Sequence, residues 1–212
     1  MFMKRYNGEC TMSTHRITNP NHPTYPELES QLHRHVDNLF RRYSKLILLR
    51  VDFAYLRHLS EFTHQDVHGL CADMVQLETR LDDINGIAGY NWVAEYGTGH
   101  RYHAHCAIFI NGQQRAKAWP IFREIEKHWR SITEDEGYAH RCIPQRHYKV
   151  RSEEMTEYDD ESGVNAMKYI LSYMAKTEQK PDGVLSRFST IPDKSRRGRP
   201  RQHDRKSLVS VG

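Results

Sequence analysis

Two strand-like runs joined by a glycine-rich turn decide the fold: Tyr90-Asn91-Trp92-Val93-Ala94-Glu95-Tyr96, then Gly97-Thr98-Gly99-His100, then Arg101-Tyr102-His103-Ala104-His105-Cys106-Ala107-Ile108-Phe109-Ile110. Aromatic and β-branched side chains recur in both runs, and two glycines fall between them, which is typical of a β-hairpin. Asn111-Gly112 ends the second run. We therefore expect an antiparallel pair of strands over residues 90–110.

The segments on either side of this hairpin alternate between helix and strand patterns. Apolar residues recurring every three or four positions predict amphipathic helices, whereas the short apolar run 46–53 predicts a buried strand. The other expected elements are a helix opening at Pro26 with the apolar stripe Leu28, Leu32, Val36, Leu39, Phe40 and Tyr43; a helix from the capping-box signal Thr63-x-x-Asp66 to about Asp83; a helix over 116–132; a short strand at 147–150; an acidic loop at 153–161; and a last helix over about 164–177. This order predicts an α+β fold, with helices packed over a central, mainly antiparallel β-sheet.

The composition of the 212-residue chain limits its class. With 38% hydrophobic and 27% charged residues, the chain is too apolar for full disorder, and a chain of this length buries roughly 70% of its unfolded surface. No run approaches the roughly 18–20 apolar residues of a membrane helix, and we expect no secretory signal in Met1-Phe2-Met3-Lys4-Arg5. The four cysteines stand singly, which argues against disulfides or a thiolate zinc site and favours a reducing cytosol.

The positive charge is concentrated at the carboxyl end. Residues 193–212 carry a net +5 and the other 192 residues −1, which gives the formal net charge of +4. Such a tail either binds a polyanion, because each Lys or Arg near a phosphate releases a counterion, or is a disordered, solubilising end. Arg197-Gly198-Arg199-Pro200-Arg201 resembles an AT-hook core, which favours DNA. We expect nucleic acid to be contacted by Arg196, Arg197, Arg199 and Arg201. The chain is thus divided into a flexible arm (1–24), a folded domain (25–192) and a basic disordered tail (193–212).

His103-Ala104-His105 lies inside the second predicted strand. Strand alternation places both imidazoles on one face, where two neutral rings can chelate a divalent ion and leave positions open for a substrate oxygen. Glu95 shares that face if it pairs with His103 or His105, which requires an odd number of residues in the turn; two glycines make such a turn easy. Two nitrogens and one carboxylate oxygen suit Mg²⁺ or Mn²⁺ at a phosphate. The alternative interpretation is a pair of surface histidines on a half-exposed strand.

A second chemical feature lies in the last predicted helix. Tyr169 and Tyr173 are one turn apart and Lys176 follows three residues later, so a helix would project all three to one side. A phenol with a pKa of about 10 is a poor nucleophile in free solution. Beside an ammonium group, and facing a phosphate polarised by a metal, it can attack phosphorus and form a phosphotyrosine. Alternatively the tyrosines are packing residues with hydrated hydroxyls, an interpretation that fits Tyr169 in particular.

Taken together, the carboxylate, the His-x-His strand and the later Tyr-x-x-Lys helix resemble the HUH endonucleases that start rolling-circle replication. More narrowly, the chain resembles the replication-initiator-like family of filamentous (inovirus) phages and the related YagK/YfjJ prophage proteins. The matching stretches, which span residues 45 to 190, are Arg50-Val51-Asp52, Trp92-Val93-Ala94-Glu95, Tyr102-His103-Ala104-His105, Asn111-Gly112, Trp129, Leu171-Ser172-Tyr173-Met174-Ala175-Lys176 with Lys180, and Arg187-Phe188-Ser189. Each motif is short, and their order and spacing carry the specificity.

This resemblance implies a central antiparallel sheet with the His-x-His strand in its middle. The implied activity is nicking of one DNA strand at a specific sequence or hairpin, which leaves a tyrosine on the 5′ phosphate and a free 3′ hydroxyl. By the same resemblance His103 and His105 hold the metal, and Glu95 is the third ligand that some HUH groups use where others use His or Gln. The implied partners are single-stranded or hairpin DNA and host replication proteins, in the cytoplasm of a bacterial host.

The resemblance also assigns roles in the last helix. Tyr173 falls on the nucleophile and Lys176 on the lysine that orients or neutralises the scissile phosphate. Initiators with two active tyrosines often show Tyr-x-x-Lys-Tyr-x-x-Lys, but Ser172 replaces the first lysine here, so the role of Tyr169 as a second nucleophile stays open. Asp52 lies in a matching stretch and is expected to have a supporting or structural role.

Two other functions compete with a DNA nickase. A DNA-binding regulator on the same fold would need the basic tail and loops but not the histidines and Tyr173 together. An unrelated metalloprotein would need the His/Glu site alone, and neither the tail nor the tyrosine helix.

Overall fold

The predicted hairpin forms the middle of a six-stranded antiparallel sheet. In this computed structural model, which describes residues 17–56, 66–99, 101–145 and 150–192, β2 (Ile87–Gly97) pairs with β3 (Arg101–Asn111), and β1 (Lys45–Tyr55) lies on the other side of β3. The strand order is β4-β1-β3-β2-β6. The shorter strands are β4 (Gly137–Arg141), β5 (Met155–Glu157), which also pairs with β1, and β6 (Ser186–Phe188). The prediction of an α+β fold with a central antiparallel sheet is confirmed.

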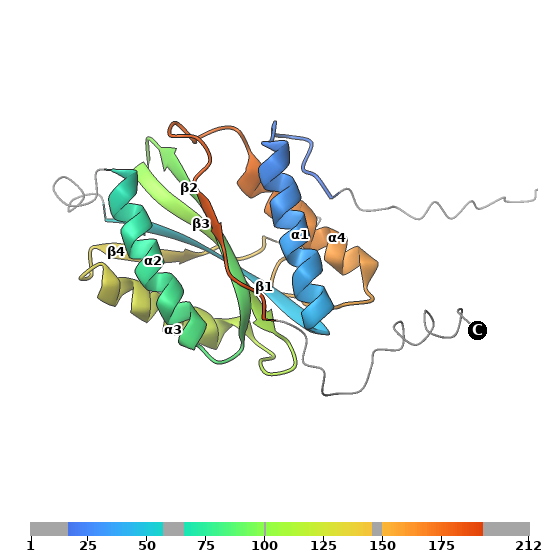
Figure 1. The fold of residues 1–212 in the computed structure, drawn as a ribbon. Coiled ribbons are helices and arrows are strands. Elements are labelled where there is room, and N and C mark those ends of the chain that lie inside the picture. Colours follow the sequence, from blue (N-terminus) through green and yellow to red (C-terminus); the bar gives the residue numbers. More distant parts are fainter. Residues whose placement is uncertain (1–16, 57–65, 100, 146–149, 193–212) are drawn as a thin grey trace, which may run out of the picture.

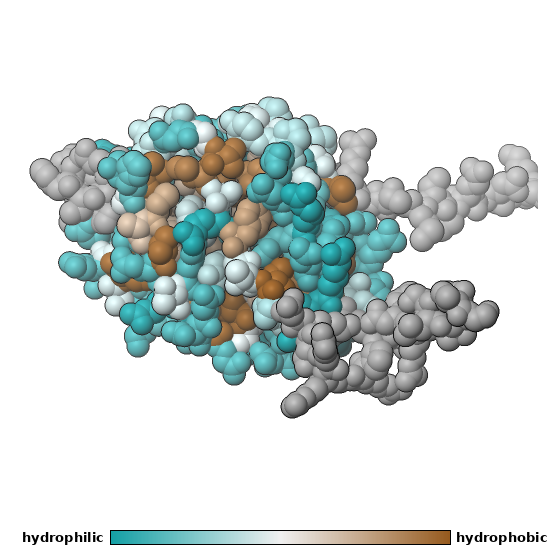
Figure 2. Space-filling view, viewed as in Figure 1, coloured by the Kyte–Doolittle hydropathy of each residue, from teal (hydrophilic) through white to brown (hydrophobic). Residues whose placement is uncertain are grey.

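Helices cover both faces of this sheet (Figure 1). α2 (Val67–Asp83) and α3 (Ala118–Ile132) pack on one face, which we call the α2–α3 face. α1 (Pro26–Arg42) and α4 (Glu161–Ser172) pack on the other, the α1–α4 face, where α4 continues into one 3₁₀ turn, η1 (Tyr173–Ala175). Figure 2 shows hydrophilic side chains over the helices and hydrophobic ones gathered between α2 and α1, along the β6 edge. No helix in the described ranges has both the length and the apolar composition to cross a bilayer.

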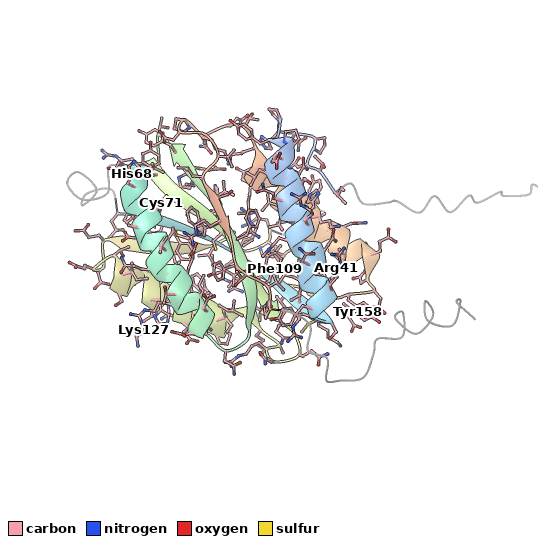
Figure 3. The ribbon with its side chains drawn as sticks, viewed as in Figure 1. Arg41, His68, Cys71, Phe109, Lys127 and Tyr158 are labelled. Atoms are coloured by element: carbon pink, nitrogen blue, oxygen red, sulfur yellow. The ribbon has the colours of Figure 1, made fainter. Side chains whose placement is uncertain are left out.

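Alternation along β3 divides its side chains between two cores. Cys106 and Ile108 belong to the core on the α2–α3 face, which also contains the buried Trp129. Ala107 and Phe109 belong to the core on the α1–α4 face, and Figure 3 shows Phe109 between the sheet and α1. Because side chains two residues apart share a face, the two histidines of the His-x-His strand point to the α1–α4 face.

The predicted helix starts are correct at Pro26 and need one correction at α2. α1 begins at Pro26, and its predicted stripe is buried except for Tyr43, which is half-buried. At α2 the N-cap is Asp66, whose side chain accepts a hydrogen bond from the backbone N–H of Gly69 at 2.9 Å. The acidic residue of the predicted capping signal is therefore the N-cap itself, the helix starts at Val67, and Thr63 lies outside the described residues.

Two other predictions differ from the structure, and a third lies almost wholly outside the described residues. The expected acidic loop over 153–161 contains β5, and β4 was not predicted; both strands are short and alternate too little to stand out. The last helix does not run to residue 177, because the α-helix ends at Ser172 and η1 follows. Of the expected strand at 147–150, residues 147–149 lie outside the described ranges, and Val150 is in a bend.

Gly137 lets β4 approach α3, since a Cβ there would lie 2.5 Å from the indole nitrogen of Trp129.

Candidate metal centre and tyrosine cleft

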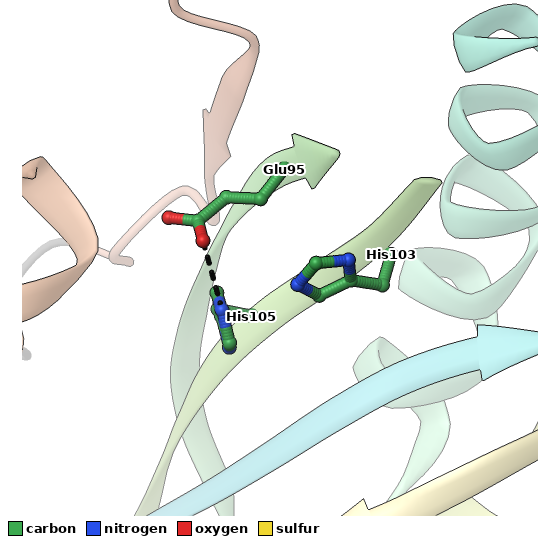
Figure 4. Close-up of side chains that lie close together, drawn as sticks. All are labelled: Glu95, His103 and His105. Carbon is green, nitrogen blue, oxygen red and sulfur yellow. Dashed lines mark hydrogen bonds and ion pairs between the residues drawn. The ribbon is translucent and has the colours of Figure 1, made fainter. Parts of the chain in front are cut away.

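Glu95, His103 and His105 meet on the α1–α4 face at the turn end of the hairpin. Glu95 is the register partner of His103, and Gly97 pairs with Arg101, so three residues form the loop and the odd count predicted from sequence is confirmed. The candidate ligand atoms of the three side chains lie within 4.8 Å of one another, and all three residues are buried. Figure 4 shows the two imidazoles and the carboxylate directed toward one another. This group could hold a metal ion.

The Nδ1 nitrogen of each imidazole lies next to a hydrogen-bond acceptor. Nδ1 of His105 lies 2.6 Å from Oδ1 of Asp52, its register partner on β1, and Nδ1 of His103 lies 3.0 Å from the carbonyl oxygen of Arg101. Both partners only accept, so each Nδ1 carries a proton and donates it. Such outer contacts fix the tautomer and ring orientation of metal-binding histidines. They give Asp52 the supporting role that the sequence left undefined.

Two buried lysines hold the carboxylate of Glu95. Lys180 Nζ donates to Glu95 Oε1 at 2.7 Å and to the carbonyl oxygen of Lys176 at 2.8 Å, and Lys176 Nζ donates to Glu95 Oε2. Oε2 also lies 3.1 Å from Nε2 of His105. A carboxylate oxygen has two lone pairs, so metal ligation through Oε2 requires one of these contacts to be released. Because the ionised carboxylate only accepts, Nε2 of His105 donates to it, so ligation of an ion by Glu95 Oε2 and His105 requires this mutual contact to open.

Burial and pairing set the protonation of this cluster. Burial raises the pKa of Glu95, but the hydrogen bond to His105 and the two lysines outweigh it and hold the pKa at about 2. Burial likewise raises the pKa of Asp52, and the bond to His105 and the charge of Arg50 bring it down to about 2. Burial lowers the pKa of His103. Burial lowers the pKa of His105 as well, but the hydrogen bonds to Asp52 and Glu95 outweigh it and raise that pKa. Glu95 is thus ionised and His103 neutral, the forms that bind metals, whereas His105 has to release a proton to bind one.

Tyr173 lies beside this group and is surrounded by cationic side chains. Its ring centroid is 6.1 Å from that of His105 and 5.3 Å from that of His22. Lys176 Nζ lies 4.3 Å from the ring centroid, and the guanidinium carbon of Arg50 lies 5.7 Å from it. The 3₁₀ turn after Ser172 places the tyrosine here. Tyr173 and Lys176 therefore adjoin the histidines, as expected, although Lys176 is buried on Glu95 and not exposed beside the phenol.

A cleft of about 740 Å³ opens next to the tyrosine. Asp52, His105, Tyr169 and Tyr173 line it, and so does Arg50. β4, which pairs with β1, and the segment after it also line the cleft, through His140, Arg141, Cys142, Ile143, Pro144 and Gln145. A cleft lined by Arg50 and Arg141 suits a phosphate backbone.

The segment before α1 closes one side of the site. The backbone N–H of Asn19 donates to Oγ of Ser172 at 2.9 Å, and Thr177 N–H donates to the carbonyl of Pro23 at 2.9 Å. The backbone N–H of Tyr25 donates to the carbonyl of Ala175 at 2.8 Å. Residues 17–24, which we assigned to a flexible arm, thus pack against η1 and hold the turn that carries Tyr173. Ser172, noted in sequence only as a missing lysine, accepts one of these bonds.

Sequence reasoning missed three residues of the site. Lys180 and Arg50 lie in stretches that matched the family, but no role was derived for them, because the distant residues they contact become neighbours only in the folded chain. Arg141 lies on β4, a strand that was not predicted. The tail arginines Arg196, Arg197, Arg199 and Arg201 lie outside the described residues. Comparisons with protein-family models, curated proteins and solved structures found no match to this chain.

Proposed function

We propose that this protein nicks and rejoins single-stranded DNA through a tyrosine nucleophile, as an HUH-type initiator of rolling-circle replication of a phage or mobile element. The observation that carries the proposal is the 6.1 Å between the rings of Tyr173 and His105, at the edge of one cleft. A structural histidine pair has no need of an adjoining half-buried phenol ringed by cations. Packing alone does not explain buried charges here, because burying ionised groups costs several kcal/mol per ion.

The chain supplies a nucleophile, positive charge and a binding surface for the step. The Tyr173 hydroxyl gives its proton to water and its oxygen forms a bond to the scissile phosphorus. The bond from phosphorus to the 3′ oxygen breaks, and that oxygen takes a proton from water and leaves as a 3′ hydroxyl. Reversing the step rejoins the strand. Arg50, which lines the cleft and lies over the phenol ring, is placed to neutralise the phosphate. When bound by His103, His105 and Glu95, Mg²⁺ or Mn²⁺ supplies Lewis-acid polarisation of a phosphate oxygen.

Other residues of the proposal act outside this step. Lys176 holds Glu95 and places an ammonium over the phenol ring. Tyr169 lines the same cleft and is a candidate for a second strand transfer or for a DNA contact. The four tail arginines add phosphate contacts, and we place the reaction in the cytoplasm of a bacterial host with its replication proteins.

The test is a search for a covalent protein–DNA adduct. The full chain is incubated with a pool of random-sequence single-stranded and hairpin DNA and Mn²⁺ or Mg²⁺, then run on a denaturing gel. We expect an adduct that Tyr173→Phe abolishes. Tyr169→Phe, on α4 just before the turn and lining the same cleft, is the matched control and keeps a first adduct. Binding without an adduct under either metal would contradict the nickase and support a catalytically silent DNA-binding regulator.

A further inference from the structure

The first turn of α3 presents an exposed indole beside the cleft. Trp119 is 51% exposed, whereas the other two tryptophans of the chain, Trp92 and Trp129, are buried in the core of the α2–α3 face. The Trp119 ring stacks on Phe122, with centroids 5.6 Å apart and planes at 29°. The indole is thus held against the buried Phe122 while half of its surface stays open to solvent.

Two arginines from different elements lie over this ring. The guanidinium carbon of Arg123, on α3, is 5.8 Å from the centroid, and that of Arg141, on β4, is 5.1 Å from it. Each is also held by an acid, Arg123 by Glu126 and Arg141 by Glu153. Arg141 lines the tyrosine cleft as well. Arg141 therefore contacts both the exposed indole and the cleft, at the β4 edge of the sheet.

An indole flanked by guanidinium planes has the chemistry of a base-stacking surface. Every nucleobase has a π-face, and aromatic rings and arginines stack on unpaired bases with little regard for sequence. In a duplex each base is already covered by its neighbours, so a single strand fits this surface better.

We propose that Trp119, with Arg123 and Arg141, stacks a base of the single strand that runs out of the tyrosine cleft over the β4 edge. The proposal rests on the proposed function for the identity of its ligand. It goes beyond that function by placing a second contact on the far side of the edge strand, away from the histidines and from Tyr173.

The burial of the other two tryptophans makes the test direct. Titrating the full chain with oligothymidylate should quench its tryptophan fluorescence, because only Trp119 can meet a base. Trp119→Phe should remove the quenching but keep an aromatic ring. A matched duplex should give little quenching at the same occupancy, which is measured separately by the anisotropy of a labelled strand.

Affinity variants give a second, independent readout. Trp119→Ala should weaken oligothymidylate binding about 5- to 150-fold, the equivalent of the roughly 1–3 kcal/mol that one stacked base contributes. Arg123→Gln should weaken it less, and Arg130→Gln should leave it unchanged. Arg123 and Arg130 are matched, being on one helix, with side chains 61% and 60% exposed, and each paired with an acid.

Each result decides a separate question. Quenching by oligothymidylate together with weaker binding of Trp119→Ala supports the stacking site. Oligothymidylate binding that neither quenches the fluorescence nor changes in Trp119→Ala overturns it, assigns the indole to another partner and leaves the nickase intact. Absence of any single-strand binding by the unaltered chain overturns both the stacking site and the nickase. Circular dichroism of each variant checks the fold.

Discussion

The two faces of the central sheet are built on the same strands but differ in what they bury. On the α2–α3 face, apolar side chains cover β1, β2 and β3 from end to end, and the buried Asp73 and Glu78 accept hydrogen bonds from Tyr55 and Trp92. On the α1–α4 face the apolar core stops at the turn end of the hairpin, where Glu95 and two lysines are buried together with the histidines. The first arrangement is what stability requires. The second costs stability, and ionised groups buried in this way mark functional sites.

Substitutions on alternate residues of β3 test the comparison most strongly. His103→Ala should abolish adduct formation while keeping much of the salt-dependent DNA binding, because phosphate contacts are spread over the surface. His105→Ala should do the same. Cys106→Ala, on the opposite face of the same strand, is the matched control and should keep the adduct. Gels and anisotropy measure the two activities, and equal loss of adduct and binding in the histidine variants would make the pair structural.

The ion cluster can be broken or replaced as a whole. Glu95→Leu should lower the free energy of unfolding by roughly 3–5 kcal/mol, because it leaves two ammonium groups buried without their partner. The triple variant Glu95→Leu/Lys176→Met/Lys180→Met should recover most of that loss, since apolar replacement of a buried ion cluster is often neutral or stabilising. Urea unfolding measures both. A triple variant as unstable as the single one would show that the cluster exists for stability.

His35 makes the α1–α4 face sensitive to acid. Burial lowers its pKa to about 4, from 6.5 in the unfolded chain. Between pH 6.5 and pH 4, His35 is protonated in the unfolded chain but neutral in the folded chain. The free energy of unfolding therefore falls by roughly 3 kcal/mol as the pH drops through this range. His35→Leu should remove this part of the pH dependence in urea unfolding. If the free energy of unfolding of His35→Leu depends on pH as strongly as that of the unaltered chain, another group causes the acid sensitivity.

The smallest effect on stability is expected for an exposed ion pair at the first residue of β1. Lys45 Nζ lies 2.8 Å from Glu157, with side chains 38% and 52% exposed. Lys45→Ala should change the free energy of unfolding by about 0–1 kcal/mol, because water screens the pair. A loss of stability as large as that in Glu95→Leu would mean that burial does not explain why the Glu95 cluster and the Lys45–Glu157 pair differ.

Local patterns predicted the parts of the fold and site that local geometry determines. The odd loop count placed Glu95 opposite His103, helical periodicity located α1 and α3, and a short apolar run located β1. Lys180 could not be found this way, because its contact with Glu95 joins residues 85 positions apart. The hydroxyl of Ser172, where the α-helix ends, accepts a bond from Asn19, and the short β4 pairs with β1. Such features come from tertiary contacts, which a local pattern does not encode.

Mass spectrometry of the linked peptide tests the central claim most directly. After reaction with single-stranded DNA and Mn²⁺, nuclease and protease digestion should leave a nucleotide on the peptide that contains Tyr173, bonded to its phenolic oxygen. A nucleotide on any other residue, or a peptide that stays unmodified while the DNA is cut, would contradict the account.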